Sequence, residues 1–123
     1  MIKGIGVDIC SISRMEELCI NQRFKDRVFT AKEQQYACNR GVFKASSLAG
    51  MFAAKEAFSK AVGTGIGKVS FLDVEVLHEN SGKPVVATHG NAKKILENIG
   101  AKNIFLSISH EKDNAVAIVI LED

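Results

Sequence analysis

The sequence predicts an α+β fold in which a mainly antiparallel sheet packs against a long central helix and several shorter helices. Between residues 11 and 62, apolar residues recur mostly with the period of a helix, and helix-capping residues precede them. From residue 71 onward the period changes to two, with turn signals between the apolar runs. Helices gathered early and hairpins gathered late are typical of the α+β class. A chain of 123 residues supports one modest core, so we expect a single domain over residues 1–123.

The first predicted element is a strand over residues 2–9. Isoleucine and valine alternate there with Gly4, Gly6 and Asp8, so one face of the strand carries almost no side-chain bulk. Glycine weakens a strand interior, and a common reason to tolerate it is that another backbone or a ligand presses close to that face. We therefore expect such an approach beside Asp8.

Three short helices are predicted after this strand. Ser11 or Ser13 is suited to cap the first, which extends to about Ile20. A second covers residues 23–28. The third opens with the capping-box sequence Thr-Ala-Lys-Glu at residues 30–33, in which the threonine and glutamate side chains each satisfy a free backbone N–H group.

A long helix is predicted from about residue 46 to residue 62. Alanine, lysine, glutamate and phenylalanine favour a helix there. Ser46 or Ser47 is suited to cap its start, and Gly63 is suited to end it in a left-handed conformation.

Three polar residues share one face of this long helix, because positions three and four apart are neighbours on a helix surface. They are Glu56, Ser59 and Lys60, which bring a carboxylate, a hydroxyl and an ammonium group toward one volume of space. The simpler alternative is an ordinary surface ion pair between Glu56 and Lys60.

The second half of the chain predicts two hairpins separated by a helix. Alternating apolar residues, turn residues and a closing glycine mark the boundaries. The predicted segments are strands over 71–77 and 84–88, a helix over 91–98, and strands over 104–110 and 115–121.

Composition excludes several classes of function. The net charge is +2, and the chain has no Trp and one Tyr, so neither a basic surface nor base-stacking platforms for nucleic acid are expected. The three cysteines form no C-x-x-C pair, which argues against a disulfide framework or a zinc site. The longest apolar run is too short to span a bilayer, and no secretory segment is recognised. We expect a soluble, cytoplasmic protein without membrane or nucleic-acid partners.

Asp8 and Glu56 together are suited to bind a hard divalent cation. Magnesium prefers one or two carboxylates, retained waters and oxygens from a substrate phosphate, and manganese suits the same oxygens. Sequence alone makes it equally reasonable that Asp8 caps the helix that follows it.

The glycine-rich segment after the long helix, Gly63 to Lys68, is compatible with phosphate binding through backbone N–H groups. It follows a helix instead of a strand and carries Val62 and Val69 where a Walker A motif requires Gly and Ser or Thr, so that motif does not apply. The alternative is a glycine C-cap and a turn.

His110, at the end of a predicted strand, is a candidate acid, base or phosphate donor, because the histidine pKa lies near neutral pH. Local alternation places Ser107 and Ser109 on the opposite face, so a local Ser–His pair is not predicted. The alternative is a solvated turn histidine.

Three motifs in order resemble the holo-acyl-carrier-protein synthases, the short-chain family of 4'-phosphopantetheinyl transferases. The motifs are Gly4 to Ile9, Phe52 to Ala61 with Gly63 to Gly65, and Ser107 to His110. The similarity extends over nearly the whole chain. It implies transfer of the phosphopantetheine arm of coenzyme A to a serine of apo acyl carrier protein in fatty acid biosynthesis, with release of adenosine 3',5'-bisphosphate. Polyketide assembly is the other candidate setting.

The resemblance also implies roles for individual residues. Magnesium is assigned to Asp8 and Glu56; catalysis to Glu56, Lys60 and His110; coenzyme A binding to Ser59, Lys60, Gly63, Thr64, Gly65 and His110; and carrier-protein docking to Arg14 and Arg23. The general base stays open among Glu56, acting through a water, Lys60 and His110.

One position departs from the family motif, which commonly reads Gly-Arg-Phe-Ala-Ala-Lys-Glu-Ala. Met51 stands in place of the arginine, which removes a charge that helps to hold coenzyme A. We expect weaker affinity for coenzyme A, or compensation by Lys44 or Lys68.

Short members of this family resemble half of the longer, internally duplicated transferases, which implies a homotrimer with active sites between subunits. Two other functions share the acidic pair. One is a different magnesium-dependent enzyme acting on a nucleotide anhydride, and the other is a non-catalytic module that binds coenzyme A.

Overall fold

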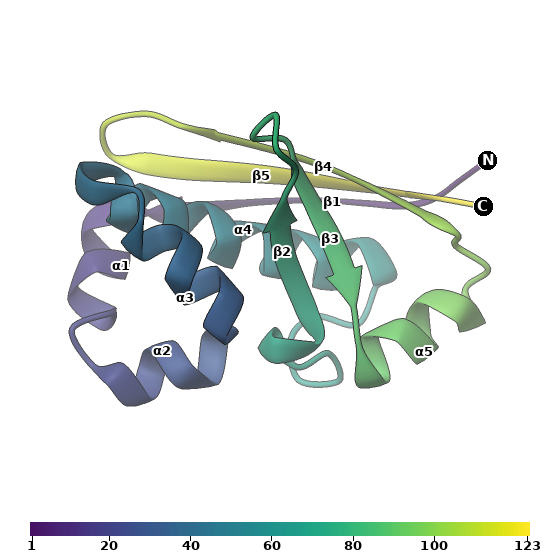
Figure 1. The fold of residues 1–123 in the computed structure, drawn as a ribbon. Coiled ribbons are helices and arrows are strands. Elements are labelled where there is room, and N and C mark those ends of the chain that lie inside the picture. The colour runs from purple at the N-terminus through teal and green to yellow at the C-terminus, as the bar shows by residue number, and fades with distance from the viewer.

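The computed structural model describes residues 1–123 and confirms an α+β fold. A three-stranded antiparallel sheet, in the order β1-β5-β4, lies across a long central helix, α4, and a separate β2-β3 hairpin crosses beside it (Figure 1). The strands are β1 (Ile2–Ser11), β2 (Val74–His78), β3 (Pro84–Thr88), β4 (Asn103–His110) and β5 (Asn114–Glu122). The helices are α1 (Ile12–Leu18), α2 (Gln22–Val28), α3 (Ala31–Cys38), α4 (Lys44–Val62) and α5 (Gly90–Asn98).

Local sequence signals set most element boundaries. The Ser11 side chain caps α1, and the capping box of α3 is complete, with Thr30 Oγ1 accepting from the N–H of Glu33 and the Glu33 carboxylate accepting from the N–H of Thr30. Gly63 ends α4 with a left-handed φ of 86°. These three predictions are confirmed.

The start of α4 differs from the prediction of a serine cap. A 3₁₀ turn over Gly41–Phe43 leads directly into the helix at Lys44, so no side chain is needed to cap it. The Ser46 hydroxyl instead donates to the carbonyl of Phe43 at 3.0 Å from inside the first turn. A second 3₁₀ turn, Phe71–Asp73, likewise replaces the beginning of the strand predicted from residue 71.

The glycine face of β1 lies directly against the backbone of α4. A Cβ atom at Gly4 would overlap the carbonyl oxygen of Ala61, and one at Gly6 would overlap that of Ala57. Only glycine on the strand and small residues on the helix allow the two backbones to approach so closely. The approach expected from the sequence is therefore made by the protein's own helix.

The core surrounds α4, which is buried on most of its circumference. Its small residues Ala53, Ala54 and Ala57 and the ring of Phe58 are fully buried, and the inward side chains of β5 complete the layer above them. No helix combines the length and apolar character needed to cross a bilayer.

A buried ion pair joins α4 to α3 and to the β2 hairpin. Lys55 Nζ lies 2.7 Å from Glu33 Oε1 and donates to the carbonyl of Phe71 at 2.7 Å, and both charged side chains have no exposed surface. The second oxygen, Glu33 Oε2, accepts from the N–H of Val76 at 2.8 Å. Burial lowers the pKa of Lys55, an effect that the carboxylate of Glu33 opposes.

The outer face of the three-stranded sheet is apolar and uncovered. On β1, Ile5, Val7 and Ile9 are 60%, 55% and 65% exposed. In register with them on the neighbouring strands lie Val116 and Ile118, and Phe105 is also exposed on β4. Monomeric proteins seldom leave a contiguous surface of this kind in water.

Replacement of Lys55 by methionine is expected to lower the free energy of unfolding by about 3–5 kcal/mol, because it leaves the Glu33 carboxylate buried without its counter-charge. Lys60→Met, on the same helix, is a matched control. Its side chain is 53% exposed, so its loss is expected to cost below about 1 kcal/mol. Urea denaturation of both variants measures the difference, and equal losses would contradict this account of the buried pair.

Candidate active site

The close packing of β1 on α4 brings Asp8 and Lys60 together. Lys60 Nζ lies 3.0 Å from Asp8 Oδ1 and donates to the carbonyl of Val7 at 3.1 Å. The Asp8 side chain is 17% exposed, whereas that of Lys60 is 53% exposed. The carboxylate is therefore recessed, and the ammonium group reaches it from the solvent side. The structure therefore brings the β1 aspartate to Lys60 on the charged face of α4, whereas the meeting of Asp8 with Glu56 around a cation stays a prediction.

Glu56 adds a second carboxylate to the same neighbourhood. Its pKa is raised, first by burial and then by the negative charge of Asp8, while the ammonium group of Lys60 opposes the shift. A carboxylate whose pKa is raised by a neighbouring carboxylate favours a cation bound beside the two. No third acid, histidine or cysteine completes a metal-binding group. This donor set fits Mg²⁺, which takes one or two carboxylates and fills its other positions with waters and phosphate oxygens.

Ser59 does not share the accessible face of Glu56 and Lys60. Its side chain is fully buried, and its hydroxyl donates to the carbonyl of Glu56 at 2.6 Å. Residues at i, i+3 and i+4 share one face of a helix. Because α4 is buried on most sides, neighbouring elements cover part of that face, including Ser59. The expectation that the Ser59 hydroxyl points at the same volume as the two charges is wrong in this protomer.

The glycine-rich exit of α4 uses its backbone donors within the chain. The N–H of Gly63 donates to the carbonyl of Lys60, and those of Thr64 and Gly65 donate to the carbonyl of Ser59 at 3.2 and 3.1 Å. The segment is thus a helix C-cap, the simpler of the two interpretations of the sequence. The Thr64 hydroxyl donates to the carbonyl of Gly65 at 3.1 Å.

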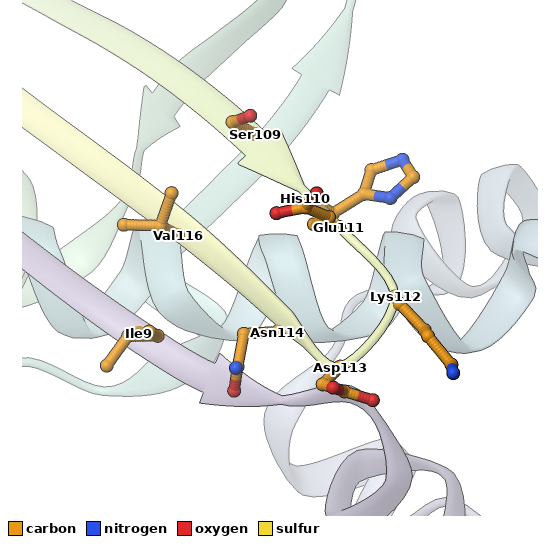
Figure 2. Close-up of a pocket in the computed structure, with 8 residues that line it drawn as sticks. All are labelled: Ile9, Ser109, His110, Glu111, Lys112, Asp113, Asn114 and Val116. Carbon is orange, nitrogen blue, oxygen red and sulfur yellow. The ribbon is translucent and has the colours of Figure 1, made fainter.

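His110 lies apart from these charges within one protomer. It pairs with Ala115 of β5, which in turn pairs with Cys10 of β1, so two strand spacings, about 10 Å, separate it from β1. It makes no hydrogen bond or ion pair to Asp8, Glu56 or Lys60. In Figure 2 its imidazole projects from the end of β4, away from Ile9 and Val116.

A cavity of about 500 Å³ lies at the end of the β4–β5 hairpin, where His110 is one of its walls (Figure 2). Residues from β1, β4, β5 and the connecting turn line it. They are Ile9, Ser109, His110, Glu111, Lys112, Asp113, Asn114 and Val116. Asp8, Glu56 and Lys60 are not among them, so the cavity and the acidic pair are separate features of the protomer.

The two predicted docking arginines lie on different helices. Arg14 is exposed on α1, and its charge opposes the increase in the pKa of the Cys10 thiol that burial and then Asp8 cause. Arg23 is exposed on α2, where it lines a shallow depression with Asn21, Asp26 and Arg27.

The structure places Met51 beside residues that the sequence did not single out, among them Arg40 and His78. Met51 is only 1% exposed and lines a cavity that also contains Arg40, Tyr36 and His78. Lys44, expected to replace the missing charge at position 51, lines a different cavity. Arg40 and His78 are 38 residues apart and belong to no local motif, so only the tertiary fold brings them together.

The pKa of the Cys10 thiol depends on the charges of Asp8 and Glu56. Its pKa is raised to about 11 by burial, then by Asp8, with a small addition from Glu56. Asp8→Asn is expected to lower this pKa and to increase the alkylation rate of Cys10 several-fold near pH 9, because the thiolate is the reactive form. Glu17→Gln on α1 removes an equal charge that does not act on Cys10. Mass spectrometry of alkylated peptides measures both, and an unchanged rate in Asp8→Asn would contradict the geometry.

Comparison with known proteins places this geometry in a family. The family model described as "4'-phosphopantetheinyl transferase superfamily" matches residues 4–119. A holo-[acyl-carrier-protein] synthase of Alkaliphilus metalliredigens is 49% identical over 121 residues, which cover 98% of this chain and 98% of the relative.

Two solved structures have the same fold. A holo-[acyl-carrier-protein] synthase from Neisseria meningitidis superposes with a TM-score of 0.89 at 41% identity, over 100% of both chains. A holo-(acyl-carrier-protein) synthase from Bacillus anthracis, in complex with CoA (3',5'-ADP), superposes with a TM-score of 0.82 at 45% identity, over 98% of this chain and 96% of the other. The resemblance seen in the three sequence motifs is confirmed, and this chain belongs to the 4'-phosphopantetheinyl transferase superfamily.

Proposed function

We propose that this protein, acting as one domain, transfers 4'-phosphopantetheine from coenzyme A to a serine of apo acyl carrier protein. The observation that carries the proposal is the meeting of Asp8 and Lys60, 3.0 Å apart, beside the Glu56 carboxylate of raised pKa. The coenzyme A complex of the Bacillus anthracis relative supports the choice of donor. The names of the relatives support the choice of acceptor.

The proposed reaction is a displacement at phosphorus. The serine oxygen of the carrier bonds to the β-phosphorus, the bond from that phosphorus to the bridging oxygen of the pyrophosphate breaks, and adenosine 3',5'-bisphosphate leaves with that oxygen. Chemistry of this kind depends on positioning and on stabilising negative charge. Asp8 and Glu56 would hold Mg²⁺, which supplies charge neutralisation to the pyrophosphate when bound.

Lys60 and Glu56 have distinct parts in this scheme. Lys60 holds its ammonium group at the exposed edge of Asp8, where it meets an incoming phosphate oxygen. Glu56, beside the proposed cation, is proposed to take the serine proton through a water. His110 is too remote within the protomer for this step.

We also propose that the active protein is a homotrimer whose clefts combine two protomers. The uncovered apolar sheet face, Ile5, Val7, Ile9, Phe105, Val116 and Ile118, supports an obligate interface. The separation of His110 from the acidic pair is a second, independent argument for the trimer, since a neighbouring protomer can supply the histidine. The glycine-rich loop after α4 can then line the cleft between the two protomers.

Arg14 and Arg23 are proposed to dock the carrier protein. Both side chains are exposed and lie on consecutive helices at one end of α4, away from the β2–β3 hairpin (Figure 1). Exposed arginines pair well with carboxylates on an acidic partner and mainly accelerate its association.

Transfer is tested by mixing the protein with coenzyme A, Mg²⁺ and an apo carrier protein. The carrier is expected to gain the mass of one phosphopantetheine arm. Glu56→Gln and Lys60→Met are each expected to lower kcat/KM about 100-fold or more, the usual loss when a charge-stabilising group is removed. Lys94→Met, an exposed lysine of α5, is the matched control and retains activity.

Two outcomes would contradict the transferase. Hydrolysis of the coenzyme A anhydride without modification of the carrier indicates a different nucleotide enzyme. Binding of coenzyme A without any turnover indicates a non-catalytic module.

A charge on the apolar sheet face is expected to separate the protomers. Ile118→Glu places a carboxylate at the centre of this face, opposite Val7 of β1, and is expected to give monomers with little transferase activity. Ile20→Glu is the matched control, because Ile20 is 84% exposed but lies outside the sheet. Sedimentation velocity measures the assembly, and a wild-type monomer or a trimeric Ile118→Glu variant would contradict the proposed interface.

A further inference from the structure

A second cavity, of about 160 Å³, lies between α3, the first turns of α4, the β2–β3 turn and the end of β4. Its walls carry polar and positively charged groups, and no acidic residue lines it. The residues on which the argument rests are Tyr36, Arg40, Met51, His78 and His110.

Arg40 brings an unneutralised charge to this cavity. Its guanidinium carbon lies 5.7 Å from the centre of the Tyr36 ring and 5.8 Å from that of Phe43. No carboxylate forms an ion pair with it. Aromatic faces hold a guanidinium group in place without cancelling its charge, so its N–H donors stay free for an anion.

The aromatic support of Arg40 is itself fixed. The Tyr36 ring stacks on His78 with centroids 3.7 Å apart and an angle of 4° between the planes. Phe43, the other ring beside Arg40, also lies 6.0 Å from the ring of His110. Arg40 and His110 thus both lie beside the ring of Phe43.

His78 forms part of the wall of this cavity. Its Nδ1 atom is buried and has no hydrogen-bond partner, which is unusual for a buried polar atom. Burial, and next the charge of Arg40, lower the pKa of His78. The stacked rings of His78 and Tyr36 thus form a wall that supports Arg40.

Met51 closes the cavity with an apolar wall at the position where the family motif has arginine. The cation missing from that position is therefore supplied inside the same cavity from another element, the end of α3. Neither Lys44 nor Lys68 lines this cavity.

We propose that Arg40 binds the 3'-phosphate of coenzyme A in this cavity and replaces the charge that Met51 lacks. This inference rests on the proposed function, which supplies the ligand. Coenzyme A carries a pyrophosphate, assigned above to the acidic pair and Lys60, and one separate phosphate monoester that needs its own cation. A cavity of about 160 Å³ admits a phosphate group but not the whole nucleotide, and a guanidinium fork matches phosphate oxygens in pairs.

The test compares coenzyme A with dephospho-coenzyme A, which lacks only the 3'-phosphate. In the wild-type protein, KM is expected to be lower for coenzyme A. Arg40→Gln is expected to raise KM for coenzyme A about tenfold, the loss of one charge-assisted contact, and to leave KM for dephospho-coenzyme A within about twofold. Met51→Arg in the Arg40→Gln background is expected to restore the preference.

Arg27→Gln is the matched control, because Arg27 is exposed on α2 and lines no part of this cavity. The control is expected to leave the ratio of the two KM values unchanged. An Arg40→Gln variant that raises both KM values equally, or neither, overturns the proposal.

Calorimetry with adenosine 3',5'-bisphosphate and adenosine 5'-monophosphate separates this inference from the proposed function. Arg40→Gln is expected to weaken binding of the bisphosphate and to leave binding of the monophosphate unchanged. A wild-type protein that modifies no carrier refutes the transferase, whereas equal effects of Arg40→Gln on both nucleotides refute the phosphate site alone. Circular dichroism confirms that the variants are folded.

Discussion

The contact between the glycine face of β1 and the backbone of α4 is the constraint on which the rest of the molecule depends. Side chains at Gly4 or Gly6 would collide with the carbonyls of Ala61 and Ala57, so the strand and the helix have one relative position. That position sets Asp8, two residues after Gly6, at the level of Lys60, which follows Ala57 on the helix. The close packing of Gly4 and Gly6 on α4 thus determines where Asp8 and Lys60 lie relative to each other.

Burial separates the charged residues of α4 that stabilise the fold from those that are available to a ligand. Lys55 and Lys60 are five positions apart, yet one is enclosed with Glu33 and the other lies at the surface beside Asp8. The enclosed pair ties α3 to β2, since the Glu33 carboxylate also holds the N–H of Val76. Tyr36 and His78 follow three and two residues later on these two elements, so the buried pair also fixes the rings that stack in the smaller cavity.

Predictions from the sequence succeeded where a structure depends on neighbouring residues or where a motif is specific to one family. The capping box at Thr30, the left-handed Gly63, the late hairpins and the family were all predictable, because each depends on a few neighbouring residues or on ordered motifs. The start of α4 was missed because a preceding 3₁₀ turn made a cap unnecessary. Ser59 was misplaced because periodicity identifies a face but not what covers it. The Arg40 cavity joins segments distant in sequence and therefore has no linear pattern.

The way α4 ends has an electrostatic meaning for the neighbouring chemistry. The carboxyl end of a helix carries a partial negative charge from its last carbonyls, which disfavours anions and favours cations. Here the N–H groups of Gly63, Thr64 and Gly65 cover only the carbonyls of Ser59 and Lys60. The helix macrodipole favours phosphate binding at the amino end of a helix. At the carboxyl end of α4 the same macrodipole disfavours phosphate binding. In the proposed function, a polyanionic substrate at this end of α4 needs positive charge beside it, so the direction of the helix favours binding of the cation and the nucleotide together.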